Sequence, residues 1–187
     1  MKELVFLLEE ESAKAMLEGL LPRLLPQDLH VRFLVFEGKQ DMERQIARKI
    51  RGYRNPDASF IVLRDQDSHP DCSAVKAKLV ALCNEGGRPD ALVRIACREL
   101  ESFYLADLLA VEKGLGISGL VRHQASRKFR APDGLSSPSR ELSTLTKGHY
   151  QKVSGSRAIA PWLDIENTRS PSFRSLVTGI GRLAGTN

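Results

Sequence analysis

Two aspartates that follow an apolar run are the strongest chemical signal in the sequence. Residues 60–63, Phe-Ile-Val-Leu, are apolar and partly β-branched, which is typical of a strand buried on both faces of a parallel sheet. Asp65 and Asp67 follow, and if the backbone is still extended there, both carboxylates point to the same side. Two such carboxylates repel unless a proton or a cation lies between them, and Mg²⁺ or Mn²⁺ is the expected cation. The alternative is that both are loop and helix-capping residues.

Further acids follow two other predicted strands. Residues 2–8 predict a strand that runs into Glu9, and residues 91–97 predict a strand that leads to Glu99 and Glu101. Because functional groups in an open parallel sheet collect at the carboxyl ends of the strands, these acids and the Asp65/Asp67 pair are expected on one rim.

Three residues besides Glu99 are secondary candidates. Asp71 and His69 lie just after the aspartate pair, and a loop histidine with no partner visible in the sequence has a structural role as its alternative. Glu10 is a candidate because Glu9, Glu10 and Glu11 are consecutive, which leaves the register of the first acid open by one position. We expect Glu9 to be the functional acid, and Glu10 and Glu11 to be turning already into the following helix, whose dipole favours acids.

The elements that must position these residues alternate between strand and helix. Each connection contains a helix long enough for parallel pairing, so the sequence predicts a three-layer, Rossmann-like α/β core with a four-stranded, mainly parallel sheet. Residues 1–113 are expected to form this core, and residues 114–187 a basic, mostly helical C-terminal extension packed on it. The predicted strands are 2–8, 28–36, 60–63 and 91–97, and the predicted helices are 13–21, 40–53, 72–85, 99–113, 139–146, 150–163 and 173–183.

Length and composition indicate a soluble globular protein. The chain has 187 residues and a net charge of +5, and no apolar run approaches the roughly 18 to 20 residues that span a bilayer. The apolar run near the N-terminus is short and acid-flanked, unlike a secretory signal, so a cytoplasmic location is expected. The three cysteines lack metal-binding spacing and are expected to be reduced and to serve in packing. Trp162 is expected in the core of the C-terminal lobe.

Positive charge is concentrated in one segment. Residues 121–160 contain eight Lys or Arg against two acids. This pattern favours a polyanionic partner such as nucleic acid, and a solvated basic surface is the alternative. Lys152 and Arg157 are the candidate contacts to phosphate.

The order of these motifs resembles a known domain. An apolar strand ending in Glu9, followed later by a strand ending in Asp65 and Asp67, resembles the Toprim domain of topoisomerases, DnaG-type primases and overcoming-lysogenisation-defect nucleases. More closely, nearly the whole chain resembles a prokaryotic Toprim-like family of unknown function. Its members are often encoded beside an ABC-type ATPase, in settings that point to phage defence. The segments that carry this resemblance are LRDQDSHPDCSAVKAKL, VRIACRELESFYLADL and YQKVSGSRAIAPWLDIENTRSPSF.

The resemblance implies a function and a set of roles. It implies a Mg²⁺-dependent nuclease that acts on nucleic acid, DNA being expected over RNA, with an ABC-type ATPase as a partner. Glu9 matches the general acid/base or metal-binding glutamate, and Asp65 and Asp67 match the aspartates that hold Mg²⁺. Glu99 and Glu101 match the ELE of the narrower family. Only one is expected to reach the metal, because positions i and i+2 of a helix do not face each other; Glu101 is the expected ligand and Glu99 a secondary candidate.

Two points qualify the transfer of roles. The residue after the Toprim glutamate is commonly Gly, and here it is Glu10, whose charge would weaken the approach of a phosphate. This departure favours the alternative function, a non-catalytic module that binds nucleic acid or a partner ATPase. The resemblance also extends over Tyr150, Lys152, Ser156 and Arg157, which are expected to contact phosphate or to lie on an exposed helix face.

Overall fold

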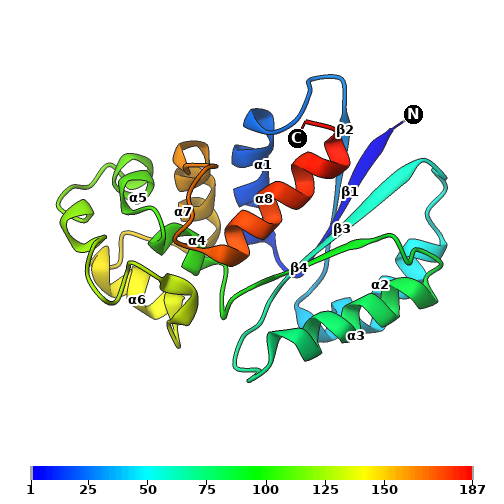
Figure 1. Cartoon of the computed structure of the whole chain (residues 1–187), viewed down its shortest axis with the longest axis horizontal. Coiled ribbons are helices and arrows are strands. Elements are labelled where there is room, and N and C mark those ends of the chain that lie inside the picture. The colour runs from blue at the N-terminus through cyan, green and yellow to red at the C-terminus, as the bar shows by residue number, and fades with distance from the viewer. Residues whose placement is uncertain (1, 187) are drawn as a thin grey trace.

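A computed structural model describes residues 2–186 and shows an α/β fold with a four-stranded sheet. All strand pairs are parallel, and the strand order is β2-β1-β3-β4 (Figure 1). The strands are β1 (Glu3–Leu8), β2 (His30–Val35), β3 (Ala58–Asp65) and β4 (Leu92–Ala96). The helices are α1 (Glu11–Leu20), α2 (Lys39–Arg51), α3 (Cys72–Glu85), α4 (Glu101–Leu105), α5 (Leu108–Leu115), α6 (Pro138–Leu145), α7 (Lys152–Ile159) and α8 (Pro171–Ala184).

The sheet lies between two helical layers, as its apolar sequence requires. Successive side chains of β1 alternate between the faces: Leu4, Phe6 and Leu8 belong to one core cluster and Val5 and Leu7 to the other. Helices α1 and α8 cover the first face, and α2 and α3, with the buried Cys83, cover the second (Figure 1). The prediction of a three-layer α/β fold is confirmed, and the sheet is entirely rather than mainly parallel.

The parallel register brings the strand ends to one edge of the sheet. Leu8, the last residue of β1, pairs with Leu63 of β3, and Asp65 of β3 pairs with Ala96 of β4. Glu9 therefore leaves the sheet close to the point where β3 ends. Helices α4 to α7 form a lobe beside this edge, and α7 packs against α1 (Figure 1).

The predicted helix over residues 99–113 is wrong in one respect, because the structure has two helices there. Helix α4 ends at Leu105 and α5 begins at Leu108. Asp107 separates them: its carboxylate accepts hydrogen bonds from the backbone N–H groups of Ala110 (3.1 Å) and Asp164 (2.8 Å). A side chain that caps a new helix in this way competes with continuation of the old one.

Trp162 lies at the surface, so its predicted place in the core is wrong. It ends a short 3₁₀ turn after α7, and 52% of the residue is exposed. The Lys113 ammonium lies 5.3 Å from the centre of the indole ring, a cation–π distance that explains how an exposed ring is partly covered.

Nowhere between residues 2 and 186 is there a helix both long enough and apolar enough to cross a membrane.

Candidate active site

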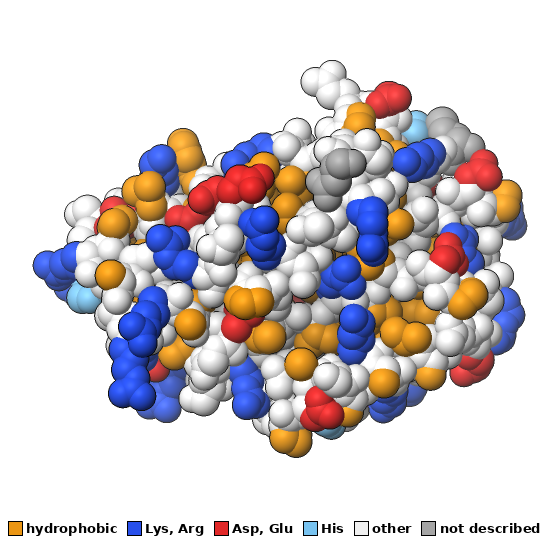
Figure 2. Space-filling model, in the orientation of Figure 1, with side chains coloured by type: hydrophobic (Ala, Val, Ile, Leu, Met, Phe, Trp, Pro, Cys, Tyr) orange, Lys and Arg blue, Asp and Glu red, His pale blue; other side chains and the backbone are white. Residues whose placement is uncertain are grey.

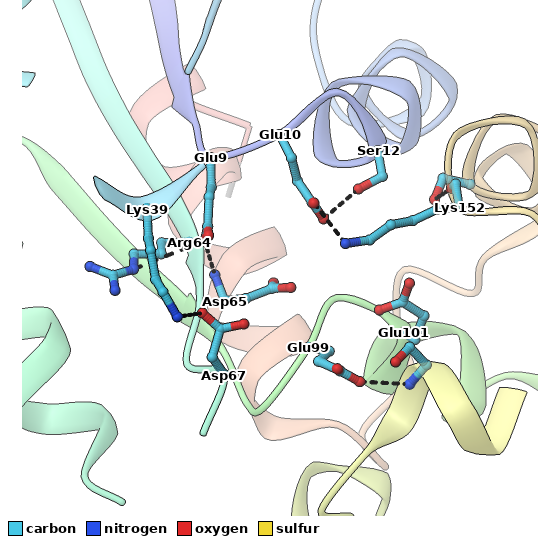
Figure 3. A network of polar contacts seen from close by, with 12 residues as sticks. Glu9, Glu10, Ser12, Lys39, Arg64, Asp65, Asp67, Glu99, Glu101 and Lys152 are labelled. Carbon is cyan, nitrogen blue, oxygen red and sulfur yellow. Dashed lines mark hydrogen bonds and ion pairs between the residues drawn. The ribbon is translucent and has the colours of Figure 1, made fainter. Parts of the chain in front are cut away.

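Five carboxylates surround the carboxyl edge of the sheet (Figure 3). Asp65 lies among them at the end of β3. Burial raises the pKa of the Asp65 carboxyl well above its usual value, and the nearby carboxylates of Glu101, Glu10 and Glu9 raise it further. The fold therefore concentrates negative charge here at an electrostatic cost. We call Glu9, Glu10, Asp65, Asp67 and Glu101 the acidic rim.

Glu9 is fixed by the backbone of the neighbouring strand. Its Oε2 accepts a hydrogen bond from the Asp65 backbone N–H at 3.1 Å and lies 3.9 Å from Arg64 Nε. Burial raises the pKa of Glu9 above its usual value, and the charge of Asp67 adds to this. A carboxyl group that is held in place and protonates more readily than a free one suits proton transfer.

Asp67 does not continue the extended strand, so the expected strand-like pairing with Asp65 is wrong. Its φ is +56°, in the left-handed region that Asp tolerates better than most residues. Its backbone N–H donates to the carbonyl of Arg98 at 2.6 Å, and Arg98 is itself left-handed, with a φ of +61°. The turn places Asp67 Oδ2 3.0 Å from Lys39 Nζ, beside Glu9 (Figure 3). Strained backbone is thus confined to this edge and to Lys147, among the described non-glycine residues.

Glu10 also belongs to the rim, contrary to the expectation that it turns into the helix. Helix α1 begins at Glu11, whereas Glu10 is extended. Its carboxylate accepts hydrogen bonds from Lys152 Nζ and Ser12 Oγ, both at 2.7 Å (Figure 3). Burial disfavours the charge of Lys152, but the bond to Glu10 and the charges of Glu101 and Asp65 prevail and raise the pKa of Lys152. Lys152 is therefore the positive charge that α7 places beside the rim, where it pairs with Glu10.

Glu101 is the acid of the ELE motif whose side chain is enclosed in the protein. It is 1% exposed, its Oε1 accepts a hydrogen bond from the Tyr150 hydroxyl at 2.9 Å, and its Oε2 is buried without a hydrogen-bond partner. Burial raises its pKa. Glu99 precedes α4 and instead accepts a hydrogen bond from the Ser139 backbone N–H at 2.7 Å. The two glutamates therefore have different partners, and only Glu101 is fully enclosed.

The Tyr150 ring reaches Glu101 because Gly155 leaves room for it. A Cβ on Gly155 would lie 2.5 Å from Tyr150 Cδ2, closer than packed carbon atoms can approach. Tyr150 and Ser156 are both buried, so the expectation that they contact phosphate is wrong. Tyr150 positions Glu101 instead.

The remaining candidates have local partners. His69 is exposed and its Nδ1 accepts the Asp71 backbone N–H, while Asp71 caps α3 by accepting the Ser73 backbone N–H at 2.8 Å. The structural alternative thus explains both residues. Arg157 is exposed on α7, whereas Lys152 points into the rim, so the structure separates these two.

Sequence reasoning missed two basic residues at the rim, Lys39 and Arg64. Arg64 is 7% exposed and donates to Glu43 Oε1 at 2.6 Å, and Glu43 also accepts from Lys78. Arg64 Nε lies buried beside Glu9 without a hydrogen-bond partner. The position of Arg64, a charged residue within β3 directly after the apolar run, was a visible signal. Lys39 gave no such signal, because it begins an amphipathic helix.

Removing Arg64 should therefore cost stability. Arg64→Met leaves Glu9 and Glu43 without their shared cation, and because Glu43 is partly exposed we expect a loss of about 2 to 3 kcal/mol, below the range for fully buried pairs. Urea unfolding at pH 7 measures this change. Arg48→Met, on the exposed face of α2, is the matched control and should change stability by less than about 0.5 kcal/mol. Equal effects of the two substitutions would show that the contacts of Arg64 with Glu9 and Glu43 do not stabilise the protein.

The chemistry of the rim suits a hard divalent cation. The acidic rim offers only carboxylate oxygens, the donors that Mg²⁺ and Mn²⁺ prefer, and Glu101 Oε2 is a buried acceptor without a donor. In the part of the chain that is described, no three Asp, Glu, His or Cys side chains are already arranged to hold a metal. Lys39 and Lys152 hold Asp67 and Glu10 instead. The residues fit a cation that competes with these two ammonium groups.

The fold and the rim define an α/β protein with an acidic site at the carboxyl edge of a parallel sheet. Over residues 8–181 the sequence matches the family described as domain of unknown function (DUF4276), and the chain belongs to that family. The match extends from the end of β1 into α8, and so includes the whole rim. No curated protein and no solved structure matches the chain.

Proposed function

We propose that the protein is a divalent-cation-dependent, Toprim-type phosphodiester-processing enzyme that acts on nucleic acid. The observation that carries the proposal is the placement of Asp65, whose pKa is raised by burial and by three neighbouring carboxylates. Such crowding is relieved by a cation, and acids at the carboxyl ends of parallel strands are where α/β proteins place their functional groups. The resemblance of the Glu9 and Asp65/Asp67 segments to Toprim domains supports the same function.

The proposal assigns a role to each rim residue. Asp65, Asp67 and Glu101 would hold Mg²⁺ or Mn²⁺, with Glu9 beside them, and the bound ion would neutralise phosphate charge and lower the pKa of a water molecule. Glu9, whose pKa is raised, takes up or releases a proton at the reacting oxygen. Lys39 and Lys152 balance the rim before the cation binds.

The first test is whether the rim binds a cation. Mg²⁺ or Mn²⁺ added to the metal-free protein should stabilise it. At a free-cation concentration a hundredfold above Kd, the free energy of unfolding should rise by about 2.7 kcal/mol, and the unfolding temperature by about 5 to 10 °C for a chain of this size. Asp67→Asn, which preserves the left-handed turn and removes the charge, should lose most of this shift. Asp71→Asn, in the adjacent loop, is the control. Equal shifts in all three proteins would contradict a metal site at the rim.

A specific observation favours a second function, a non-catalytic module that binds nucleic acid or an ABC-type ATPase partner. Two of the five rim acids already pair with lysines, and Glu10 occupies the position where Toprim domains commonly have Gly. Incubation with supercoiled plasmid and with RNA, in Mg²⁺, Mn²⁺ or EDTA, separates the two functions. Metal-dependent cleavage supports the enzyme, whereas retained binding without cleavage in any metal supports the module. Both proposals are compatible with an ABC-type ATPase partner and with a role in phage defence.

A further inference from the structure

A second charged site lies between β4 and α8, and none of its lining residues belongs to the acidic rim. Here α8 crosses β4, and Arg94, Arg174 and Arg182 line a pocket of ≈ 390 Å³ together with Thr168 and Ser175. This volume lies within the roughly 300 to 1,000 Å³ of small-molecule pockets. Among the described residues, no Asp or Glu lines it. Figure 2 shows Lys and Arg side chains gathered over α8 on this face.

Arg94 is held in place by backbone atoms rather than by an acid. It lies on β4 between Leu92 and Ala96, in the row that faces α8. Its Nε donates to the Ser175 carbonyl at 2.9 Å and its Nη1 to the Val93 carbonyl at 3.0 Å. Gly179 permits this arrangement, because a Cβ there would lie 2.9 Å from Arg94 Nη2. The guanidinium is therefore oriented before any ligand arrives.

The charges in this pocket are unbalanced. Burial lowers the pKa of Arg94, and the positive charge of Arg182 lowers it further. Within residues 2–186, neither Arg94 nor Arg182 forms an ion pair, and Arg174 has only the exposed Glu166, at 4.0 Å. Two guanidinium groups close enough to repel, in a pocket without an acid, are stabilised by an anion.

We propose that the pocket between β4 and α8 binds a phosphate group, with Arg94 and Arg182 as its main ligands. The planar guanidinium fork matches two phosphate oxygens, and the Ser175 and Thr168 hydroxyls complete a polar lining. The phosphate belongs either to the backbone of a nucleic acid or to a free phosphate ligand. This site stands apart from the proposed cleavage chemistry, because Arg94 precedes the end of β4 and lies outside the acidic rim. The competing explanation is that Arg94 only protects edge strand β4 from pairing with another sheet.

The experiment measures phosphate binding in EDTA, so that no cleavage takes place. In the first arm, sodium phosphate replaces sodium chloride at constant ionic strength and should raise the unfolding temperature of the wild type. Arg94→Gln/Arg182→Gln should abolish this rise, whereas Arg44→Gln/Arg48→Gln, with the same charge change on α2, should keep it. Arg94→Lys and Gly179→Ala retain the charge but disturb the fork, so each should reduce the rise even if the double variant folds poorly.

The second arm distinguishes the two sources of phosphate. A labelled DNA duplex is titrated at several salt concentrations, and the pocket double variant should flatten the dependence of log K on log salt by about 0.9 per lost contact, or about 1.8 for the pair. A flattened slope identifies nucleic acid as the source. An unchanged slope, together with loss of the phosphate-induced rise, identifies a free phosphate ligand. If the pocket variants behave as the α2 control does in both arms, the proposal is overturned and Arg94 is an edge-protecting residue.

Discussion

Asp65→Asn should make the metal-free protein more stable at neutral pH while removing the proposed metal-dependent cleavage. The substitution keeps the size of the side chain and removes a charge that is partly buried beside Glu9, Glu10 and Glu101. We expect a gain of at least about 1 kcal/mol, as is common when a destabilising functional residue is replaced. For a chain of this length that corresponds to roughly 2 to 4 °C in the unfolding temperature. Thermal unfolding in EDTA at pH 7.5 measures it.

The dependence of this gain on pH follows from the direction of the pKa shift. The folded-state pKa of Asp65 is raised above its ordinary value of 3.8, so the folded protein binds this proton more tightly than the unfolded chain does. Stability from Asp65 is therefore present below pH 3.8 and is lost as pH rises through the folded pKa. Glu9 and Glu101 shift in the same direction. The advantage of Asp65→Asn should be small in acid and should grow towards neutral pH.

Asp28→Asn provides the control for this prediction. Asp28 lies exposed in the turn before β2, and its substitution makes the same chemical change without burial. It should leave both the unfolding temperature and its pH dependence close to those of the wild type. If Asp65→Asn behaves in the same way, or destabilises the protein at pH 7.5, the carboxylates of the rim do not strain the fold as inferred.

The sequence predicted the rim because the rim depends on local patterns. Apolar runs define β1 and β3, parallel pairing brings their carboxyl ends together, and the acids at 9, 65 and 67 follow from that placement. Both the fold class and the meeting of these acids at one edge could be inferred without coordinates. Only the packing of the lobe could show that Glu101 is enclosed and that Glu99 is tied to α6.

What the sequence did not predict depends on contacts between distant segments. The ion pair between Lys152 and Glu10 joins residues 142 positions apart, and no periodicity indicates it. The pocket at Arg94 forms because α8 returns across β4. The Ser175 carbonyl that accepts the hydrogen bond from Arg94 is 81 positions away in the sequence. The left-handed turn at Asp67 is stabilised by Arg98 across the sheet edge, whereas the short sequence between the aspartates was compatible with an extended strand.

Glu9→Gln should lower the rate of the proposed metal-dependent cleavage by about 10² to 10⁴, the range for removal of a general acid or base. The amide keeps an oxygen for the Asp65 backbone N–H and relieves charge at the rim, so the protein should remain folded. The matched substitutions at the two adjacent acids locate the effect. Glu11→Gln should leave the rate unchanged, because Glu11 lies exposed in the first turn of α1, 3.9 Å from Lys14.

Glu10→Gln should have an intermediate effect, because Glu10 pairs with Lys152 without being fixed to the end of β3. The measurement is the cleavage rate of supercoiled plasmid at saturating Mn²⁺, with the unfolding temperature of each variant recorded alongside. Inactivity of Glu10→Gln with an active Glu9→Gln would shift the functional acid by one residue. If all three variants cleave as fast as the wild type does, the first strand contributes no acid to the reaction, and the rim would have to act through Asp65, Asp67 and Glu101 alone.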